Sequence, residues 1–314
     1  MILTAEPLFR SPQAIKVFSR QLKTRYLGKQ IVFLPRTHST NDLAMQAARD
    51  PMVPHGQIFI TDAQDSGRGR RGRKWECEPG LGLLFSVLIR SLPGSGLTKL
   101  NIANEDMYWI PLAAGLAVVE GIQAAKICGH EHPIQDGKHV RICVKWPNDI
   151  VVPSPHAPGW RKLGGILCES VLPAGPATGV EGQLGHVVIG IGLNINHTQS
   201  ALPPTDKAPA TSLCVETGGA VSRTVVLRKI LERLEQRLSD LASATTREEL
   251  KHSVEAQLRK WWQADRKLTV QTPGHGIRQG CFCGLDSTGR LKLKDENGKM
   301  FELPDGEILN ASTC

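Results

Sequence analysis

The sequence has no long apolar run and no basic segment leading into an apolar one at its start. It also has no pair of cysteines in the Cys-x-x-Cys spacing. The longest apolar runs, near Leu83–Ile89 and Ala113–Val119, are too short to span a bilayer. A secretory signal is therefore not expected either, whereas an organelle transit peptide within residues 1–28 stays open because such peptides are weakly patterned. With 40% hydrophobic and 22% charged residues, the composition is typical of a soluble globular protein, and we predict a cytoplasmic location.

The eight cysteines are scattered along the 314 residues. This distribution favours free thiols in a reducing compartment over a disulfide framework. The His130-Glu131-His132 segment lacks the helical spacing of a zinc-peptidase motif. A metal site built on cysteine or histidine is therefore not expected.

The formal net charge is +8. A basic surface favours acidic or polyanionic partners. Nucleic acid, an acidic carrier protein and a triphosphate substrate all satisfy this condition, and charge alone does not separate them.

Periodicity and turn signals predict an α+β fold in two parts. Ser39 can cap a helix that runs to about Arg49, and Thr246 with Glu249 forms a capping box for a later helix. After residue 263 short apolar pieces alternate with glycine turns, which predicts a small β-barrel. We expect an N-terminal extension at 1–28, a main domain at 29–263 and the barrel at 264–314. Further strands are expected at 30–34, 58–61, 83–89, 140–146, 162–171 and 186–191, with further helices within 1–28, at 109–126 and at 222–241; 152–158 and 202–209 are expected to be surface loops.

The segment 66–75, SGRGRRGRKW, is the densest chemical signal. Glycine lets the backbone approach a ligand closely, and arginine forks suit phosphate and carboxylate groups. Trp75 offers a flat face for a nucleobase. A disordered RNA-binding Arg/Gly segment is the alternative, but such segments are normally long and repeated. A short segment between two predicted strands favours a single ordered anion-binding loop.

Three further segments carry polar groups at strand ends. KWPND at 145–149 presents a lysine, an amide and a carboxylate where a proline ends a strand; a solvated turn would look the same. KLGGIL at 162–167 begins with a lysine that is either an anion ligand or an edge guard. GIGLNIN at 190–196 lacks the third glycine and following helix of a dinucleotide motif.

In this order and combination the segments resemble the biotin–protein ligase family. The matching pieces are STN at 39–41, Gln64 before GRGRRGRKW, KWPND, KLGGIL, GIGLNIN and Gly306-Glu307-Ile308 near the end. The resemblance covers about residues 30–312. It implies a mixed-sheet catalytic domain of the biotin/lipoate ligase type followed by an SH3-like β-barrel.

The resemblance also implies an activity. Such enzymes make biotinyl-5′-adenylate from biotin and ATP, with Mg²⁺, and then pass biotin to a lysine of a biotin carboxyl carrier protein or domain. A Gly/Arg loop that is mobile when empty and orders over the adenylate would exclude water. About 30 residues precede the matching region, too few for the DNA-binding domain of many bacterial relatives. Specific DNA binding is therefore not expected, and a monomer and a homodimer are both open.

Residue roles follow by similarity. Arg68, Arg70, Lys145 and Lys162 are expected to be catalytic, because they can neutralise the two anions that react. Asp149 is a tentative Mg²⁺ ligand, and Arg71 has no assigned role. ATP is expected to contact Arg70, Arg73, Trp75, Lys145, Asn148 and Asn194. Biotin is expected to contact Ser39, Thr40, Asn41, Gln64, Gly67, Arg68, Gly69, Arg70, Lys162, Gly165, Gly190 and Gly192.

Two other functions stay open. A lipoate–protein ligase shares the fold and the adenylate chemistry, although GRGRRGRKW and KWPND are signatures of the biotin branch. A non-catalytic nucleic-acid-binding protein would also use the arginine loop and the positive charge. Steep loss of affinity with salt would indicate the latter, whereas stabilisation by biotin with ATP would indicate a ligase.

Overall fold

A computed structural model describes residues 7–90, 107–126, 140–154, 159–171, 186–204, 208–243, 245–262, 266–274 and 276–313. Its largest element is a seven-stranded sheet with the strand order β1-β2-β3-β7-β6-β5-β4. β1 and β2 are parallel and the other neighbours antiparallel, so the sheet is mixed as expected. The strands are β1 (Ile31–Thr37), β2 (Ile58–Gln64), β3 (Gly82–Arg90), β4 (Cys143–Lys145), β5 (Asp149–Pro153), β6 (Trp160–Val171) and β7 (His186–Asn194).

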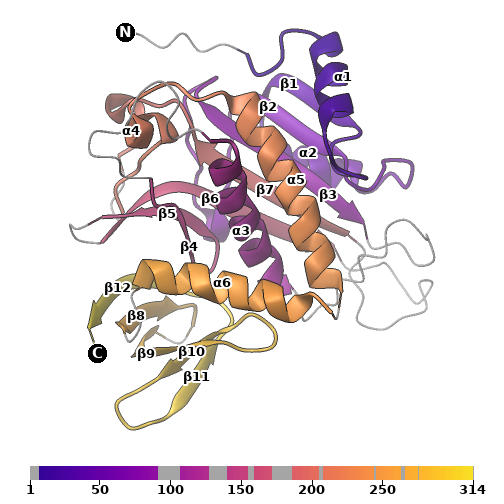
Figure 1. Cartoon of the computed structure of the whole chain (residues 1–314). Coiled ribbons are helices and arrows are strands. Elements are labelled where there is room, and N and C mark those ends of the chain that lie inside the picture. The colour runs from indigo at the N-terminus through magenta and orange to yellow at the C-terminus, as the bar shows by residue number, and fades with distance from the viewer. Residues whose placement is uncertain are drawn as a thin grey trace.

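Helices cover the two faces of this sheet unequally. α3 (Trp109–Ala124) and α5 (Arg223–Ala242) lie side by side across one face, and α6 (Arg247–Trp262) runs beneath them toward the second sheet (Figure 1). The short α2 (Thr40–Ala47) packs on β2, β3 and β7. Its apolar partners Phe59, Leu88 and Val188 form a small cluster separate from the main core. α2 therefore lies on the face opposite to α3.

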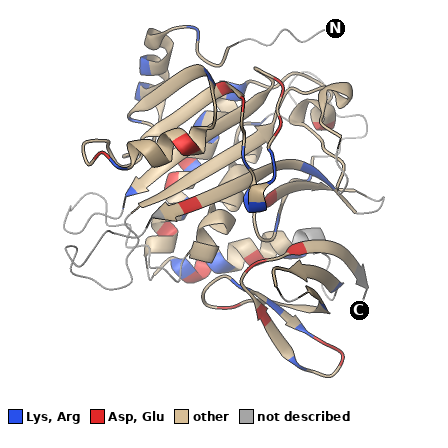
Figure 2. Ribbon diagram, turned by 180° about the vertical axis from the view of Figure 1, so that it is seen from behind, with Lys and Arg blue, Asp and Glu red and all other residues tan. Residues whose placement is uncertain are grey.

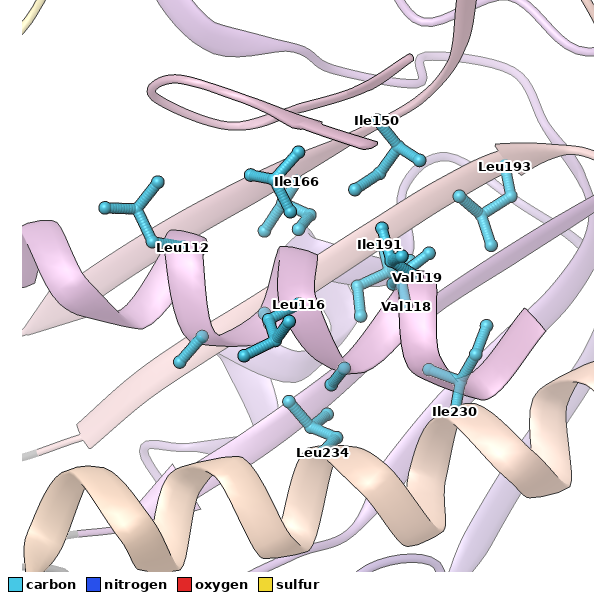
Figure 3. Packing of buried hydrophobic residues seen from close by; sticks show 14 of the residues in the cluster. Leu112, Leu116, Val118, Val119, Ile150, Ile166, Ile191, Leu193, Ile230 and Leu234 are labelled. Atoms are coloured by element: carbon cyan, nitrogen blue, oxygen red, sulfur yellow. The ribbon is translucent and has the colours of Figure 1, made fainter. Parts of the chain in front are cut away.

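The main core lies between the sheet and the two long helices. Figure 3 shows Leu116 and Val119 of α3 between Ile191 of β7 and Leu234 of α5. Gly121 allows this close packing, because a Cβ atom there would stand 2.7 Å from the Ile230 backbone. α3 is buried on nearly every side, as its run of apolar residues predicts.

The C-terminal strands form a separate five-stranded antiparallel sheet with the order β11-β10-β9-β8-β12, which agrees with the expected SH3-like barrel. Glycine and asparagine turns join the strands, as the Asn297-Gly298 signal predicts. The strands are β8 (Arg266–Thr272), β9 (Gly276–Leu285), β10 (Leu291–Lys294), β11 (Met300–Leu303) and β12 (Glu307–Thr313).

The N-terminal segment packs closely against the main sheet. It contains α1 (Pro12–Gln21), and Phe18 and Leu27 are buried in the main core. Glu235 of α5 accepts hydrogen bonds from the backbone N–H groups of Arg25, Tyr26 and Leu27. The boundary at residue 28 stays a prediction, but the packing of this segment is continuous with that of the residues beyond it.

Local sequence patterns placed most elements correctly and missed two. β4 is shorter than the strand expected at 140–146, and β5 replaces the start of the loop expected at 152–158. β5 forms because Asp149–Pro153 pairs with both β4 and β6, a long-range effect that outweighs the local proline signal. The short α4 (Leu213–Thr217) was also not expected. The barrel boundary near 264 falls on residues outside the described part.

Five described cysteines are free: Cys77, Cys143, Cys168, Cys214 and Cys283. Cys281 is disulfide-bonded, so the expectation of free thiols throughout is wrong at this position. Its partner lies outside the described residues. Among the helices of the described residues, none has the length and apolar character needed to cross a membrane.

Candidate active site

The site is built on the α2 face of the sheet, where side-chain alternation collects small residues. Gly192 of β7 pairs with Leu84 of β3 on one side and with Gly165 of β6 on the other. Gly165 in turn pairs with Asp149 of β5. Because directly paired residues point to the same face, this row forms a floor with two neighbouring glycines. Trp75 lies on that floor, since a Cβ atom on Gly192 would stand 2.8 Å from its ring.

The start of α2 lies over the next row of the same floor. Ser39 caps the helix by accepting a hydrogen bond from the Asp42 N–H, as its position in the sequence predicts. Thr40 and Asn41 follow in the first turn, and both are buried. Gly190 lies directly beneath Asn41, where any larger residue would collide with the amide. The glycine therefore makes room for the helix start.

The arginine loop is folded and forms a short hairpin. The Trp75 N–H donates to the Gly67 carbonyl over 2.8 Å, and the Gly69 N–H donates to the Arg73 carbonyl over 2.7 Å. Arg71 and Gly72 occupy left-handed conformations at the tip, with φ of 58° and 71°. The glycine serves that turn, since a side chain is strained there. An ordered loop, and not a disordered Arg/Gly segment, is the form adopted.

All four loop arginines contact carboxylates from other elements. Arg68 contacts Asp42 at 2.5 Å and Glu169 at 2.9 Å. Figure 2, seen from the side opposite to Figure 1, shows basic and acidic segments beside one another where the loop crosses the sheet. Arg70 donates to Asn148 over 2.8 Å and forms an ion pair with Asp305. Arg71 contacts the same Asp305 at 3.1 Å, and Arg73 forms an ion pair with Glu307.

Asp149 is the centre of a second charged cluster. Its carboxylate contacts Lys162 Nζ at 2.7 Å and Lys145 Nζ at 3.7 Å. Burial raises the pKa of Asp149, but the two lysines outweigh it and hold that pKa below the ordinary value. Burial lowers the pKa of Lys145, which is 4% exposed, although Asp149 opposes this. Two lysine ammonium groups therefore share one carboxylate in a partly buried site, where the interaction of these cations with a bound anion is stronger than in water.

Two adjacent cavities open beside this cluster. The first has about 900 Å³ of empty space, counting the open solvent at its mouth. The second extends toward the barrel strand β12 and Trp160. The wall common to both is formed by Arg73, Lys74, Trp75, Lys145, Asp149, Lys162 and Glu307.

Most of the predicted site residues meet at these cavities. Asn194 lines the second cavity only, and Gly67 lines neither, although it accepts the Trp75 N–H. The first cavity is lined by the predicted residues Ser39, Thr40, Asn41, Gln64, Arg68, Gly69, Arg70, Arg73, Trp75, Lys145, Asn148, Asp149, Lys162, Gly165, Gly190 and Gly192.

Sequence reasoning missed the carboxylates that surround the loop. Asp305 and Glu307 come from the barrel, more than 230 residues from the arginines that they contact. Two further residues near the site were also missed, the carboxylate Glu169 on β6 and the hydroxyl residue Ser86 on β3. A signal for Ser86 was present, because it is the polar residue within the apolar run 83–89 of β3. Glu169 carried no such signal, because β6 also contains Arg161, Lys162 and Ser170. Nothing local marked Asp305 as a partner of the loop.

The model of the biotin/lipoate A/B protein ligase family matches residues 33–194, just over half of the chain. The bifunctional ligase/repressor BirA of Bacillus spizizenii is 30% identical over 219 residues, which cover 70% of this chain and 57% of that protein. The chain thus spans little more than half the length of this relative. The biotin–[acetyl-CoA-carboxylase] ligase of Mycobacterium tuberculosis is 27% identical over 303 residues, covering 93% of this chain and 94% of that protein.

Solved structures agree with these matches. The biotin protein ligase from Aquifex aeolicus in complex with biotin and ATP superposes with a TM-score of 0.65 at 26% identity, covering 91% of this chain and 100% of that one. The family match, the mixed sheet and the shared fold lead to one conclusion. The chain belongs to the biotin/lipoate A/B protein ligase family.

Proposed function

We propose that this chain is an ATP-dependent biotin–protein ligase, which forms biotinyl-5′-AMP and then transfers biotin to a lysine of a carrier protein. One observation carries the proposal: the two cavities share a wall that contains Lys145, Lys162 and Arg73. An acid in the first cavity and a nucleotide in the second would meet at these cations. The Aquifex structure that holds both biotin and ATP supports this pairing of ligands.

The first cavity suits biotin. Leu84 and Leu167 supply apolar lining for the bicycle, and Ser39, Thr40 and Gln64 supply polar groups for the ureido end. Gly190 and Gly192 are covered by Asn41 and Trp75, so they support those side chains beneath the cavity. Two of the expected contacts need a different role. Asn41 has its polar atoms engaged within the protein, and Gly67 supports Trp75 from outside the cavity.

The second cavity suits the nucleotide. Trp75 Nε1 and Asn194 Oδ1 are buried and have no hydrogen-bond partner among the described residues, so one awaits an acceptor and the other a donor. The amino group of adenine can donate to Asn194 Oδ1, and the Trp75 ring can stack on the base. Because a stacked base lies above the ring, the in-plane Trp75 N–H would take its acceptor from another part of the ligand. Asn148 is already bonded to Arg70 and to the Ile166 carbonyl, which favours a role in holding Arg70 in place.

The shared wall explains the chemistry of both steps. A carboxylate oxygen of biotin attacks the α-phosphorus of ATP, a new O–P bond forms, and pyrophosphate leaves with the electrons of the broken O–P bond. Lys162, Lys145 and Arg73 offset the repulsion between the two anions. The carrier lysine then attacks the acyl carbon, and AMP leaves. Charge held in a fixed, partly buried place is more effective here than in water.

Magnesium fits Asp149 poorly. Its carboxylate already contacts two ammonium groups, and no cluster of three metal-binding side chains exists in the described parts of the chain. We therefore assign Asp149 as the counter-ion of Lys145 and Lys162. Magnesium would accompany ATP through phosphate oxygens and water, and no protein ligand is assigned to it.

Partners and location follow the same proposal. An acidic carrier protein or domain would suit the basic chain. The absence of DNA binding, the oligomeric state and the cytoplasmic location stay predictions. The mobility of the loop 67–75 in the absence of ligand also stays a prediction.

The test is a direct assay. The protein is incubated with Mg-ATP, a carrier domain and either biotin or lipoate, and modified carrier is detected by mass spectrometry. Biotinylated carrier is expected; labelling by lipoate alone would replace biotin with lipoate in the proposal. Thermal unfolding should also shift upward with biotin plus ATP. A protein that modifies no carrier but binds RNA with steep salt dependence would overturn it.

A further inference from the structure

One carboxylate oxygen connects the arginine loop to the start of α2. Glu169 Oε2 accepts a hydrogen bond from Asn41 Nδ2 over 2.7 Å and another from Arg68 Nη2 over 2.9 Å. Glu169 lies on β6, paired with Val188 of β7, and its side chain is 26% exposed. It lines neither cavity, so it has no part in the contacts proposed above for biotin and ATP.

The amide of Asn41 is fixed in one orientation. Its nitrogen donates to Glu169 and to the Leu167 carbonyl, both of which only accept. Its oxygen accepts from the Ser86 hydroxyl over 2.6 Å. Every polar atom of Asn41 is therefore used within the protein. Gly190 leaves room for this amide, because a Cβ atom there would stand 2.0 Å from Asn41 Oδ1.

The chain of hydrogen bonds continues to the residues proposed to contact biotin. Ser86 Oγ lies 2.8 Å from Thr40 Oγ1. Gln64 Oε1 accepts from the Thr40 N–H over 2.9 Å. Gln64 lines the first cavity, and its amide nitrogen remains a donor for an acceptor such as the ureido oxygen. The Thr40 hydroxyl also lies 3.3 Å from Gln64 Oε1, so side-chain contacts run from Glu169 through Asn41, Ser86 and Thr40 to Gln64.

We propose that Glu169 is a positioning residue that couples Arg68 in the loop to the biotin-contacting end of α2. The proposal rests on the function proposed above. When Arg68 approaches, it compensates the charge of Glu169, which in turn holds Asn41. Closure of the loop and ordering of the ureido contacts are thereby linked. Asp42 is the other charged group at Arg68, and its carboxylate is not among the hydrogen-bond partners of the Asn41 side chain in the described structure.

Three variants separate the two connections of Glu169. Glu169→Gln keeps an oxygen that can accept from Asn41 but removes the charge facing Arg68. Glu169→Ala removes both connections. Asp42→Asn is the matched control, because it removes a carboxylate that pairs with Arg68 but leaves the hydrogen bonds of the Asn41 side chain to Glu169, Leu167 and Ser86 in place. Its side chain is 52% exposed, so the pair with Arg68 is expected to contribute little.

The readouts are KM for biotin, kcat, and the half-life of biotinyl-5′-AMP on the enzyme after removal of free ligand. Glu169→Gln should keep KM for biotin within about twofold and shorten the half-life roughly tenfold, the size expected for a charge-assisted hydrogen bond. Glu169→Ala should shorten the half-life similarly and also raise KM for biotin roughly tenfold. Asp42→Asn should change the half-life less than Glu169→Gln does and leave KM for biotin unchanged.

The outcomes distinguish the two proposals. If the wild-type protein makes no biotinyl-5′-AMP, the proposed function fails. If the wild type makes it and Glu169→Gln and Glu169→Ala both match wild type in KM and half-life, the function stands and the role of Glu169 is overturned. Equal rises in KM for biotin in Glu169→Gln and Glu169→Ala would also overturn it. The loss of charge would then have the same effect as the loss of the Asn41 contact, and the two connections of Glu169 would not be separate. Thermal unfolding of each variant shows that it is folded, and equilibrium binding of biotin without ATP repeats the KM comparison.

Discussion

The indole of Trp75 lies directly against Gly192, with no room for a side chain between the ring and the β7 backbone. A Cβ atom on Gly192 would stand 2.8 Å from Cε2 of the ring, closer than real atoms approach. The neighbouring Gly165 is different, since a Cβ atom there would meet Trp75 and Lys162 at an ordinary 3.6 Å. The two glycines are paired across the strands and form a matched test.

Gly192→Ala should displace Trp75 from the wall between the cavities. Because crowding of this kind typically costs about 1–3 kcal/mol, KM for ATP should rise roughly tenfold. Gly165→Ala should leave KM for ATP within about threefold, since its contact distances are tolerated. Steady-state kinetics at saturating biotin measures both. Equal effects of the two substitutions would show that Trp75 is not held by Gly192.

Lys162→Ala should cripple the first step while leaving the fold intact. Lys162 lines both cavities and forms an ion pair with Asp149. Removing a preorganised cation from the point where two anions react should slow adenylate formation by about 100-fold or more. Pyrophosphate release in a single turnover measures this step. Lys294→Ala, which removes the same charge from an exposed barrel position, serves as the control.

Arg70→Gly should loosen retention of the adenylate. Arg70 lines the first cavity and contacts both Asn148 and the barrel. Without it, biotinyl-5′-AMP should leave the enzyme roughly tenfold faster and label lysines of a bystander protein, detected by avidin blotting. Arg36→Ala removes an arginine from the exposed pair with Asp65 and should produce no stray labelling. Absence of stray labelling by Arg70→Gly would exclude its retention role.

Asp305→Asn should weaken the hold of the barrel on the loop. Asp305 pairs with both Arg70 and Arg71, which gives Arg71 a contact that its sequence position did not suggest. Amide hydrogen exchange in residues 67–75 should become faster, since local opening costs less when those pairs are lost. Glu302→Gln, an exposed charge on β11, should not change this exchange. A loop as protected in Asp305→Asn as in wild type would refute the barrel contact as a restraint.

The free energy of unfolding should fall as the pH is lowered from about 6.5 toward 4. His197 is fully buried, and burial lowers its pKa to about 4 from an ordinary 6.5. Below about pH 6.5 the unfolded chain takes up a proton that the folded chain refuses, so stability is full above this value and declines as the pH falls toward 4. The loss from one such histidine is on the order of 2 kcal/mol at about pH 5. His55 has a similarly lowered pKa and adds to the trend.

Urea unfolding at about pH 7.5 and about pH 5 measures this effect. His197→Gln should lose less unfolding free energy between the two pH values than wild type does, because one of the two histidines no longer titrates. Its stability at the higher pH is compared separately, since the substitution also removes the contact with Cys77. Identical pH dependence in the two proteins would contradict the buried, neutral state of His197.

Local patterns predicted much of the site because they report directly on the backbone. Ser39 caps α2 and Gly192 lies at a close approach, each as a consequence of its own chemistry. The turn at Arg71-Gly72 was not predicted. The role of Asn41 was not predictable in the same way. Its position suggested a ligand contact, yet its amide is engaged by Glu169 and Ser86, which lie 128 and 45 residues away.

The sequence by itself determined the family, the two-part α+β fold and most residues around the cavities, because alternation, caps and glycine turns are local consequences of residue type. Only the tertiary structure decided what each arginine faces. Strand pairing brings Glu169 beneath Arg68, and packing of the barrel brings Asp305 and Glu307 to the rest of the loop. Such ion pairs depend on distances between remote segments, and no spacing along the chain encodes them.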